Sequence, residues 1–342
     1  MTPSARLFLF SLGAFSLTAS AADSIRSFTV PYDTVGSIER LDPALDKLVA
    51  PDAKLEKLAE GFNWSEGPVW LPGEAVLLFS DVPENTVYRW SRDTGISVFL
   101  KPSGFTGEKY EGREPGSNGL TLDRQGQLVL AQHGDRRIAR LQADAKTFET
   151  VADRFDGKRF NSPNDLCFDR AGRVFFTDPP YGLPTNAESE TGFNGVYSAL
   201  PGGEVVLLTK ELERPNGIAL SPDERTLYIA NSHGPRPIIY ALDLQARADG
   251  GLDAVNGRVF FDTTRLMASD RPGVPDGLRV DRDGNLWATG PGGVLIIDAR
   301  GRHLGTLLTG QATANCTFGE DGSTLFITAD SQLLRVRTKT KG

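Results

Sequence analysis

Six short segments of the sequence place a carboxylic acid or an amide just before an alternating apolar run. These polar residues recur at intervals of 39 to 60 positions, and they are Glu66, Asn118, Asn164, Asn216, Asp276 and Asn315. A cluster of carboxylate and amide oxygens, without imidazole or thiolate, suits a hard cation such as Ca²⁺ or Mg²⁺ better than Zn²⁺. Without a cation, two carboxylates in a narrow space would repel one another. The alternative is that each polar residue only begins a tight turn.

The six polar residues can meet only if the elements around them repeat. In the fourth unit, four strand signals fall at residues 216–221, 226–231, 238–244 and 258–263, with turn residues between them. Four-stranded units of this length are typical of β-propeller blades, whose first strands line a central channel. The sequence therefore predicts an all-β fold, a six-bladed β-propeller with the six polar residues at one end of its channel. A β-sandwich with accidental similarity between its turns is the alternative.

The last unit lacks its fourth strand, because only three strand signals follow residue 314 before the sequence stops. Residues 54–62 are a suitable replacement, and an N-terminal strand in that place would close the ring without an open sheet edge. Residues 43–58 show weak helical periodicity. We therefore expect a signal peptide at 1–21, an N-terminal extension at 22–53 and the propeller at 54–342.

The first 21 residues have the pattern of a cleavable signal peptide. Arg6 precedes an apolar run at 7–17, and Ala19, Ser20 and Ala21 match the small residues of a cleavage site. The run is too short to span a bilayer, which disfavours the alternative of a membrane anchor. We therefore expect export to the periplasm or the medium.

Composition narrows the expected partners. The formal net charge of −7 disfavours nucleic acid, since phosphate binding needs a basic face, and no other segment is apolar enough to suggest a membrane partner. A small molecule is the expected partner, and the sequence does not indicate the oligomeric state. The two cysteines, Cys167 and Cys316, fall in the third and sixth units, so we expect free, buried thiols rather than a disulfide.

At these residues the chain resembles the SMP-30/gluconolactonase/LRE family of six-bladed, calcium-dependent hydrolases. The resemblance spans roughly residues 36–337. It is strongest in EGPVW (66–70), NSPNDL (161–166), FTDPPYG (176–182), PNGIALS (215–221) and PDGLRVD (275–281). Residues 118–140 are similar to the bacterial gluconolactonase branch in particular.

The resemblance implies a metal site and a reaction. The family's metal ligands fall here on Glu66, Asn164, Asn216 and Asp276. The implied cofactor is Ca²⁺ first, with Mg²⁺ or Zn²⁺ as alternatives. In the family the metal polarises a lactone carbonyl, and Asp276 occupies the position of the general base. A bound cation would also lower the pKa of Asp276 and weaken it as a base, so holding the metal is its alternative role.

The implied function is a divalent-metal-dependent hydrolase that opens a sugar lactone. The alternatives are phosphotriester hydrolysis on the same metal site and a non-catalytic, ligand-binding propeller. Some animal members have an arginine where this chain has Ser162, so their mode of substrate recognition does not transfer. The candidate substrate-binding residues are Asn118, His133, Arg136, Asp178 and Tyr181. For the last four, a purely structural role is the alternative, and residues 103–117 form either a lid or a variable surface loop.

Overall fold

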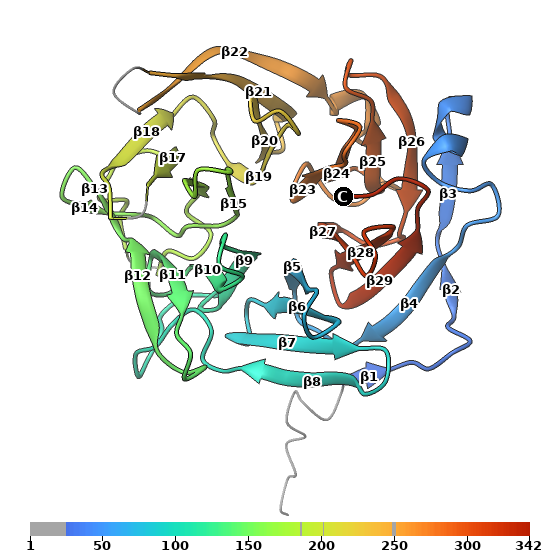
Figure 1. Ribbon diagram of the computed structural model, residues 1–342, viewed down its shortest axis with the longest axis horizontal. Helices are drawn as coiled ribbons and strands as arrows, with labels where there is room; N and C mark the ends of the chain where they lie inside the picture. The colour runs from blue at the N-terminus through green and yellow to red at the C-terminus, as the bar shows by residue number, and fades with distance from the viewer. Residues whose placement is uncertain (1–24, 185–186, 201, 248–250) are drawn as a thin grey trace, which may run out of the picture.

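Short apolar runs separated by tight turns form six antiparallel sheets arranged around one axis (Figure 1). The computed structural model describes residues 25–184, 187–200, 202–247 and 251–342. Strands that follow one another in the sequence pair as antiparallel hairpins in every blade, and N-terminal strands add to the last two sheets. The predicted six-bladed β-propeller is confirmed. The predicted signal peptide at 1–21 lies outside the described residues.

The blades follow one another along the chain. Blade 1 contains β5 (Ser65–Leu71), β6 (Val76–Asp81), β7 (Thr86–Ser91) and β8 (Gly95–Leu100), and blade 2 contains β9 (Ser117–Leu122), β10 (Leu128–Gln132), β11 (Arg137–Leu141) and β12 (Phe148–Ala152). Blade 3 contains β15 (Leu166–Phe168), β16 (Val174–Asp178), β17 (Gly195–Ala199) and β18 (Val205–Thr209). A short hairpin of β13 (Arg154–Phe155) and β14 (Lys158–Arg159) connects blades 2 and 3.

Blade 4 has longer outer strands than the blades before it. Blade 4 contains β19 (Pro215–Leu220), β20 (Thr226–His233), β21 (Arg236–Ala246) and β22 (Leu252–Asp262). Blade 5 contains β23 (Leu278–Val280), β24 (Leu286–Gly290), β25 (Gly293–Ile297) and β26 (His303–Leu308), and blade 6 begins with β27 (Thr313–Gly319), β28 (Thr324–Ala329) and β29 (Gln332–Arg337). A short 3-10 helix, η3 (Thr264–Leu266), lies between blades 4 and 5.

An N-terminal strand completes the sixth blade. β4 (Leu55–Glu60) pairs antiparallel with β29, and Glu60 stands opposite Gln332. The predicted ring closure is therefore confirmed. The weak helical signal at 43–58 is wrong beyond η2 (Pro43–Lys47), because residues 55–60 form this strand instead.

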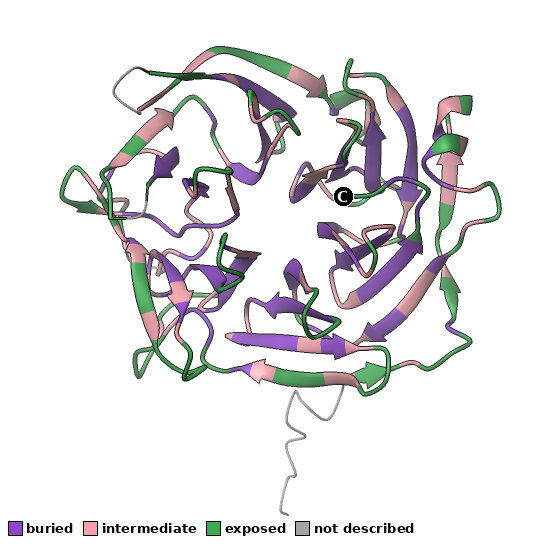
Figure 2. Ribbon diagram, in the orientation of Figure 1, coloured by how far each residue is buried: buried purple, intermediate pink, exposed green. Residues whose placement is uncertain are grey.

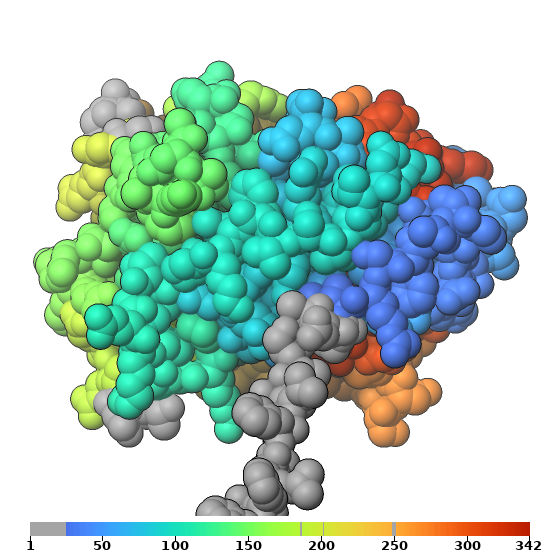
Figure 3. All heavy atoms as spheres, turned by 90° about the horizontal axis from the view of Figure 1, so that it is seen from below, coloured from blue at the N-terminus to red at the C-terminus, as the bar shows by residue number. Residues whose placement is uncertain are grey.

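The preceding residues join the sheets rather than forming a separate unit. β1 (Arg26–Ser27) and β2 (Thr34–Val35) pair with β4, and β3 (Ser37–Arg40) pairs with β26 as a fifth strand of blade 5. Figure 3 shows these residues in blue against the outer wall of the ring. The expected extension at 22–53 is thus, from residue 25 on, part of blades 5 and 6.

The apolar core lies in layers between neighbouring blades. Leu77, Phe79 and Trp90 of blade 1 pack with Phe326 and Leu333 of blade 6, all of them buried. Figure 2 shows the inner strands mostly buried and the outermost strands largely exposed. Because every layer joins two blades, the ring positions the inner strands rigidly around the channel. In the described part of the chain, no helix is long and apolar enough to span a membrane.

Both cysteines are free thiols, as expected. Cys316 is buried, whereas Cys167 is partly buried. Burial raises the pKa of Cys316 to about 12 and that of Cys167 further above its ordinary range. The thiolate form is therefore disfavoured at both positions, which makes them poor nucleophiles at neutral pH.

Candidate active site

The glycines that follow the polar residues lie where neighbouring blades approach most closely. The backbone N–H of Gly119 donates to the carbonyl oxygen of Asn164 at 2.7 Å, and that of Gly217 donates to Asp276 at 3.2 Å. A Cβ on Gly119 would lie 2.8 Å from the Asn164 oxygen, and one on Gly217 would lie 2.2 Å from the Asp276 oxygen. Both distances are too short for a side chain, so the polar-glycine pattern reflects contact between blades.

Five of the six predicted polar residues line one cavity of about 270 Å³ at the end of the channel. They are Glu66, Asn118, Asn164, Asn216 and Asp276. Trp64, Glu114, Tyr181 and Ser232 contribute to the same walls. The sixth residue, Asn315, lies behind this layer, where its amide donates to Glu66 Oε2 at 3.3 Å. The propeller thus brings together residues that lie in five different blades.

Three buried oxygens around the cavity have no hydrogen-bond donor among the described residues. They are Asn118 Oδ1, Asn164 Oδ1 and Asp276 Oδ1. Buried acceptors are normally satisfied, so three together indicate that something else occupies the space between them. A hard cation is the species that carboxylate and amide oxygens bind best. The described residues contain no group of three or more His, Cys, Asp or Glu arranged for a metal, so amide oxygens would be essential ligands here.

The carboxylates of the site are electrostatically unfavourable without a cation. Burial raises the pKa of Glu66, and the nearby charge of Asp165 adds to this effect. Burial also raises the pKa of Asp276 well above its ordinary value, and the charges of Glu66 and Asp165 raise it further. A cation bound between these groups would stabilise their ionised forms and reverse the shift. The residues present therefore fit a divalent metal ion.

Tyr181 lines the cavity, as a substrate-binding role requires. The Arg214 guanidinium lies 5.5 Å from the centroid of the Tyr181 ring, in a cation–π arrangement that holds the ring. Burial raises the pKa of Tyr181 to about 12, and the charge of Asp276 contributes. Its hydroxyl therefore stays protonated at neutral pH and can donate a hydrogen bond into the site.

His133, Arg136 and Asp178 are buried and are not among the residues that line the cavity. The Asp178 carboxylate accepts the backbone N–H groups of Asn161 and Ser162, each at 2.8 Å. Arg136 Nε donates to the Phe160 carbonyl oxygen at 2.6 Å, and Arg136 also pairs with Glu190. These two residues hold the segment that leads to Asn164.

Other residues of the site were not predicted from the sequence. Asp165 is fully buried below the cavity, with Oδ2 3.4 Å from the Asn315 amide and 3.6 Å from the Arg279 guanidinium. The sequence contains a sign of its special role, because Asp165 stands where four other units have glycine. Glu114 belongs to the loop before β9 and reaches the cavity wall. Only the expectation of a possible lid at 103–117 pointed toward it.

Comparison with known proteins gives consistent matches. The family described as SMP-30/gluconolactonase/LRE-like matches residues 64–331. A gluconolactonase of Zymomonas mobilis is 43% identical over 97% of this chain and 95% of its own, and a pentonolactonase of Haloferax volcanii is 28% identical over 77% and 80%. The solved structure of a gluconolactonase from Xanthomonas campestris matches with a TM-score of 0.76 and 32% identity, over 90% of this chain and 97% of the other. This chain therefore belongs to the SMP-30/gluconolactonase/LRE-like family.

Proposed function

We propose that this protein is a divalent-metal-dependent hydrolase that opens a sugar lactone. The observation that carries the proposal is the set of buried, donor-free oxygens of Asn118, Asn164 and Asp276 around one cavity. The gluconolactonase and pentonolactonase relatives support a lactone as the substrate. Calcium is the preferred cation because the available ligands are all oxygens and include neutral amides.

Glu66, Asn164, Asn216 and Asp276 would hold the cation. Bound there, it supplies positive charge beside the lactone carbonyl oxygen and stabilises the negative charge that develops during attack. Asp276 Oδ1 is buried and lacks a donor, so it can accept a proton from the attacking water. The water oxygen bonds to the carbonyl carbon, the ring C–O bond breaks, and the proton passes to the departing alkoxide, giving the hydroxy acid.

The remaining walls suit a small polyhydroxylated ring. Asn118 Oδ1 and the Glu114 carboxylate can accept hydrogen bonds from a substrate, and the Tyr181 hydroxyl can donate one. Trp64 adds an apolar surface beside these polar groups. A cavity of about 270 Å³ has room for a monosaccharide lactone. These contacts would orient the substrate carbonyl toward the cation site.

The test uses the purified protein freed of metal with a chelator. Hydrolysis of glucono-1,5-lactone and other aldonolactones is followed above the spontaneous rate, before and after addition of Ca²⁺, Mg²⁺ or Zn²⁺. We expect activity to be lost with the metal and restored by Ca²⁺, and Glu66→Gln to resist restoration. Equal activity with and without metal would refute metal dependence. A phosphotriester is assayed in parallel. If the protein hydrolyses the phosphotriester but no lactone above the spontaneous rate, the lactonase proposal is refuted.

We also propose that the protein is exported to the periplasm or the medium. The support is the signal-peptide pattern at 1–21, with Arg6 before an apolar run and small residues at 19–21. N-terminal sequencing of the protein made from the full-length gene is the test. We expect the mature protein to begin near Ala22, and an intact Met1 in a cytoplasmic fraction would overturn the proposal.

A further inference from the structure

A carboxylate and an imidazole stand in line behind the Asn164 side chain. His133 Nε2 lies 3.4 Å from Asn164 Nδ2, and His133 Nδ1 lies 3.2 Å from Glu114 Oε2. His133 is completely buried and is not part of the cavity wall, whereas Glu114 and Asn164 are. The imidazole therefore connects two cavity residues without itself facing the substrate.

The order of donors and acceptors along this line follows from the chemistry of its groups. The Asn164 amide nitrogen can only donate, so His133 Nε2 must accept and carry no proton. The ring proton is then on Nδ1, which lies 3.2 Å from Glu114 Oε2 without the alignment of a hydrogen bond. With its nitrogen engaged by His133, the amide leaves Oδ1 without a donor, as observed.

The imidazole is held so that it cannot turn away. The backbone N–H of His133 donates to the Gly116 carbonyl oxygen at 3.1 Å, and the His133 carbonyl oxygen accepts the N–H of Arg136 at 3.1 Å. On the other side, Gly182 packs directly on the ring, since a Cβ there would lie 2.7 Å from His133 Cγ and 2.9 Å from Nδ1. The ring position is thus fixed by the backbone of two loops.

The loop that carries Glu114 is anchored near both of its ends. Asn85 Oδ1 accepts the backbone N–H of Gly104 at 2.7 Å, and the N–H of Gly116 donates to the Val82 carbonyl oxygen at 2.9 Å. In its middle, the Tyr110 hydroxyl donates to the Gly182 carbonyl oxygen. The loop is therefore a fixed wall that presents Glu114 to His133.

We propose that Glu114 and His133 are positioning residues that orient the Asn164 amide, so that its oxygen rather than its nitrogen faces the cation site. An amide can adopt two orientations of nearly the same shape, and the wrong one would point N–H groups at a cation. His133 selects between them because Nε2 accepts a hydrogen bond only from the nitrogen. The proposal rests on cation binding in the proposed function and assigns His133 a role other than substrate contact.

The test measures Ca²⁺ binding to the metal-free, full-length protein by calorimetry. His133→Leu removes the acceptor for the Asn164 amide, and we expect Ca²⁺ affinity to fall about 10- to 100-fold. His133→Gln keeps an acceptor oxygen and should recover most of that loss. The rise in melting temperature with Ca²⁺, compared with the metal-free melting temperature of each variant, separates binding from folding.

A second pair of variants separates orientation from charge. Glu114→Gln and Glu114→Leu remove the same charge, but only glutamine keeps a side-chain oxygen beside His133 Nδ1. We expect the leucine variant to bind Ca²⁺ about 10-fold more weakly than the glutamine variant. Glu111→Gln is the matched control, because Glu111 lies in the same loop, pairs with Lys109 and is largely exposed, with 59% of its side chain accessible.

The outcomes are distinguishable. If the wild-type protein binds Ca²⁺ and both Glu114 variants bind it equally well, the positioning role is refuted while metal dependence stands. If the wild-type protein binds no divalent cation, the metal part of the proposed function fails and the positioning role fails with it. Should His133→Leu not fold, the Glu114 pair still decides, because that side chain is 31% exposed and its replacement disturbs little packing.

Discussion

The Asn315 side chain donates to the Glu66 carboxylate across 3.3 Å, although the two residues are 249 positions apart. The same amide nitrogen lies 3.4 Å from Asp165 Oδ2, which is itself 3.6 Å from the Arg279 guanidinium. A neutral amide thus separates two buried carboxylates, and an arginine balances the deeper one. This polar chain forms the floor beneath the cavity and joins four blades.

The first prediction concerns the Arg279 guanidinium in this floor. Arg279→Met leaves the Asp165 carboxylate buried without its partner, so we expect the free energy of unfolding to fall by about 3 kcal/mol. The double variant Arg279→Met with Asp165→Asn removes both charges and should recover more than half of that loss. Urea unfolding of the metal-free protein measures both. The exposed Arg282 provides the control Arg282→Met, and losses that simply add in the double variant would contradict the pairing.

The second prediction separates catalysis from folding at Asp276. A raised carboxyl pKa means that the folded, metal-free protein releases the Asp276 proton less readily than the unfolded chain, so ionisation of this group costs the fold stability. The ionisable group therefore destabilises the metal-free fold at neutral pH. Asp276→Asn should leave the melting temperature in chelator equal to or above the wild-type value, while lactone hydrolysis falls at least about 100-fold. A variant that keeps near wild-type hydrolysis would show that the assigned role is wrong.

The third prediction is a pH dependence that arises from Asp178. Burial raises its pKa from 3.8 to about 7, against the opposing effect of the Asn161 and Ser162 N–H groups. Between about pH 4 and pH 7 the folded state holds a proton that the unfolded state has lost, so this group lowers stability as pH rises, by up to about 1.4 kcal/mol per pH unit. Asp178→Asn should remove that slope.

Urea unfolding midpoints of the wild type and of Asp178→Asn at pH 5, 6, 7 and 8 test this prediction. The variant also loses an acceptor for one backbone N–H, which lowers its stability equally at every pH. Only the difference in slope is therefore informative. Asp144→Asn, at an exposed turn, is the control and should keep the wild-type slope. Parallel curves for the wild type and Asp178→Asn would contradict the raised pKa.

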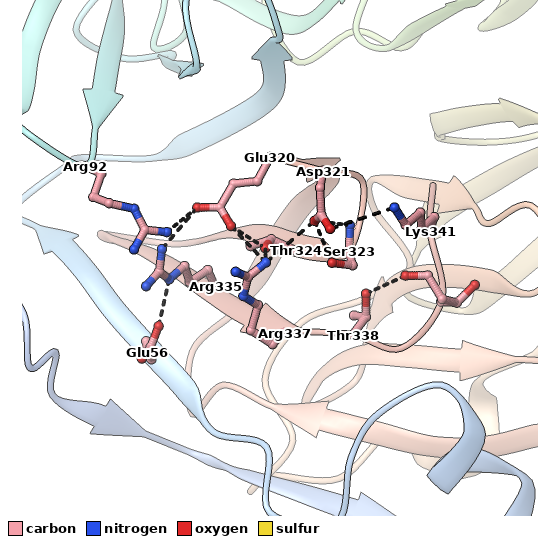
Figure 4. Close-up of polar contacts among 11 residues, drawn as sticks. Glu56, Arg92, Glu320, Asp321, Ser323, Thr324, Arg335, Arg337, Thr338 and Lys341 are labelled. Carbon is pink, nitrogen blue, oxygen red and sulfur yellow. Dashed lines mark hydrogen bonds and ion pairs between the residues drawn. The ribbon is translucent and has the colours of Figure 1, made fainter.

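The fourth prediction concerns the junction between the first and last parts of the chain (Figure 4). Arg335 on β29 donates to Glu56 on β4 at 2.7 Å and also pairs with Glu320 at 3.4 Å. Its guanidinium lies 4.9 Å from the Tyr32 ring, and only 8% of the side chain is exposed. Arg335 therefore links the closing strand to the sixth blade through charge and packing together.

Arg335→Met leaves Glu56 and Glu320 without this partner, and we expect a loss of about 1–3 kcal/mol in the free energy of unfolding. Arg337→Met is the matched control, because Arg337 lies on the same strand and pairs with Glu320 but is 60% exposed. An exposed pair of this kind contributes about 0.5 kcal/mol or less. Equal losses in the two variants, measured by chemical unfolding, would contradict the role given to Arg335.

Much of the fold could be predicted because it repeats. The polar entrance, followed by glycine in four units, and the two-residue alternation recur six times, and they located the first strands and hence the ring that contains Glu66 and Asp276. The missing strand of blade 6 was also visible in the sequence, as a unit without its end. By contrast, β3 (Ser37–Arg40) is short and largely polar, so nothing in its pattern indicates that it pairs with β26.

The site was only partly predictable because its second layer depends on side-chain contacts between loops. His133 follows β10 and was expected to reach the substrate, yet the packing of Gly182 and the loop with Glu114 place it behind Asn164. Asp165 departs visibly from the glycine pattern, but its meaning depends on Arg279 in another blade. Periodicity reports which face a residue occupies, and it contains no information on which loops meet.

Because β4 closes the ring, the sixth blade cannot be completed until the end of synthesis. Glu56 on β4 and Arg335 on β29 are 279 positions apart. β4 is synthesised early and therefore cannot pair with β29 until almost the entire chain has been made. At ordinary rates of translation that interval is on the order of tens of seconds. Throughout it, the edge of β4 that pairs with β29 is open to pairing with other strands. A circularly permuted gene that starts at residue 62 and appends β4 after β29 would remove the delay.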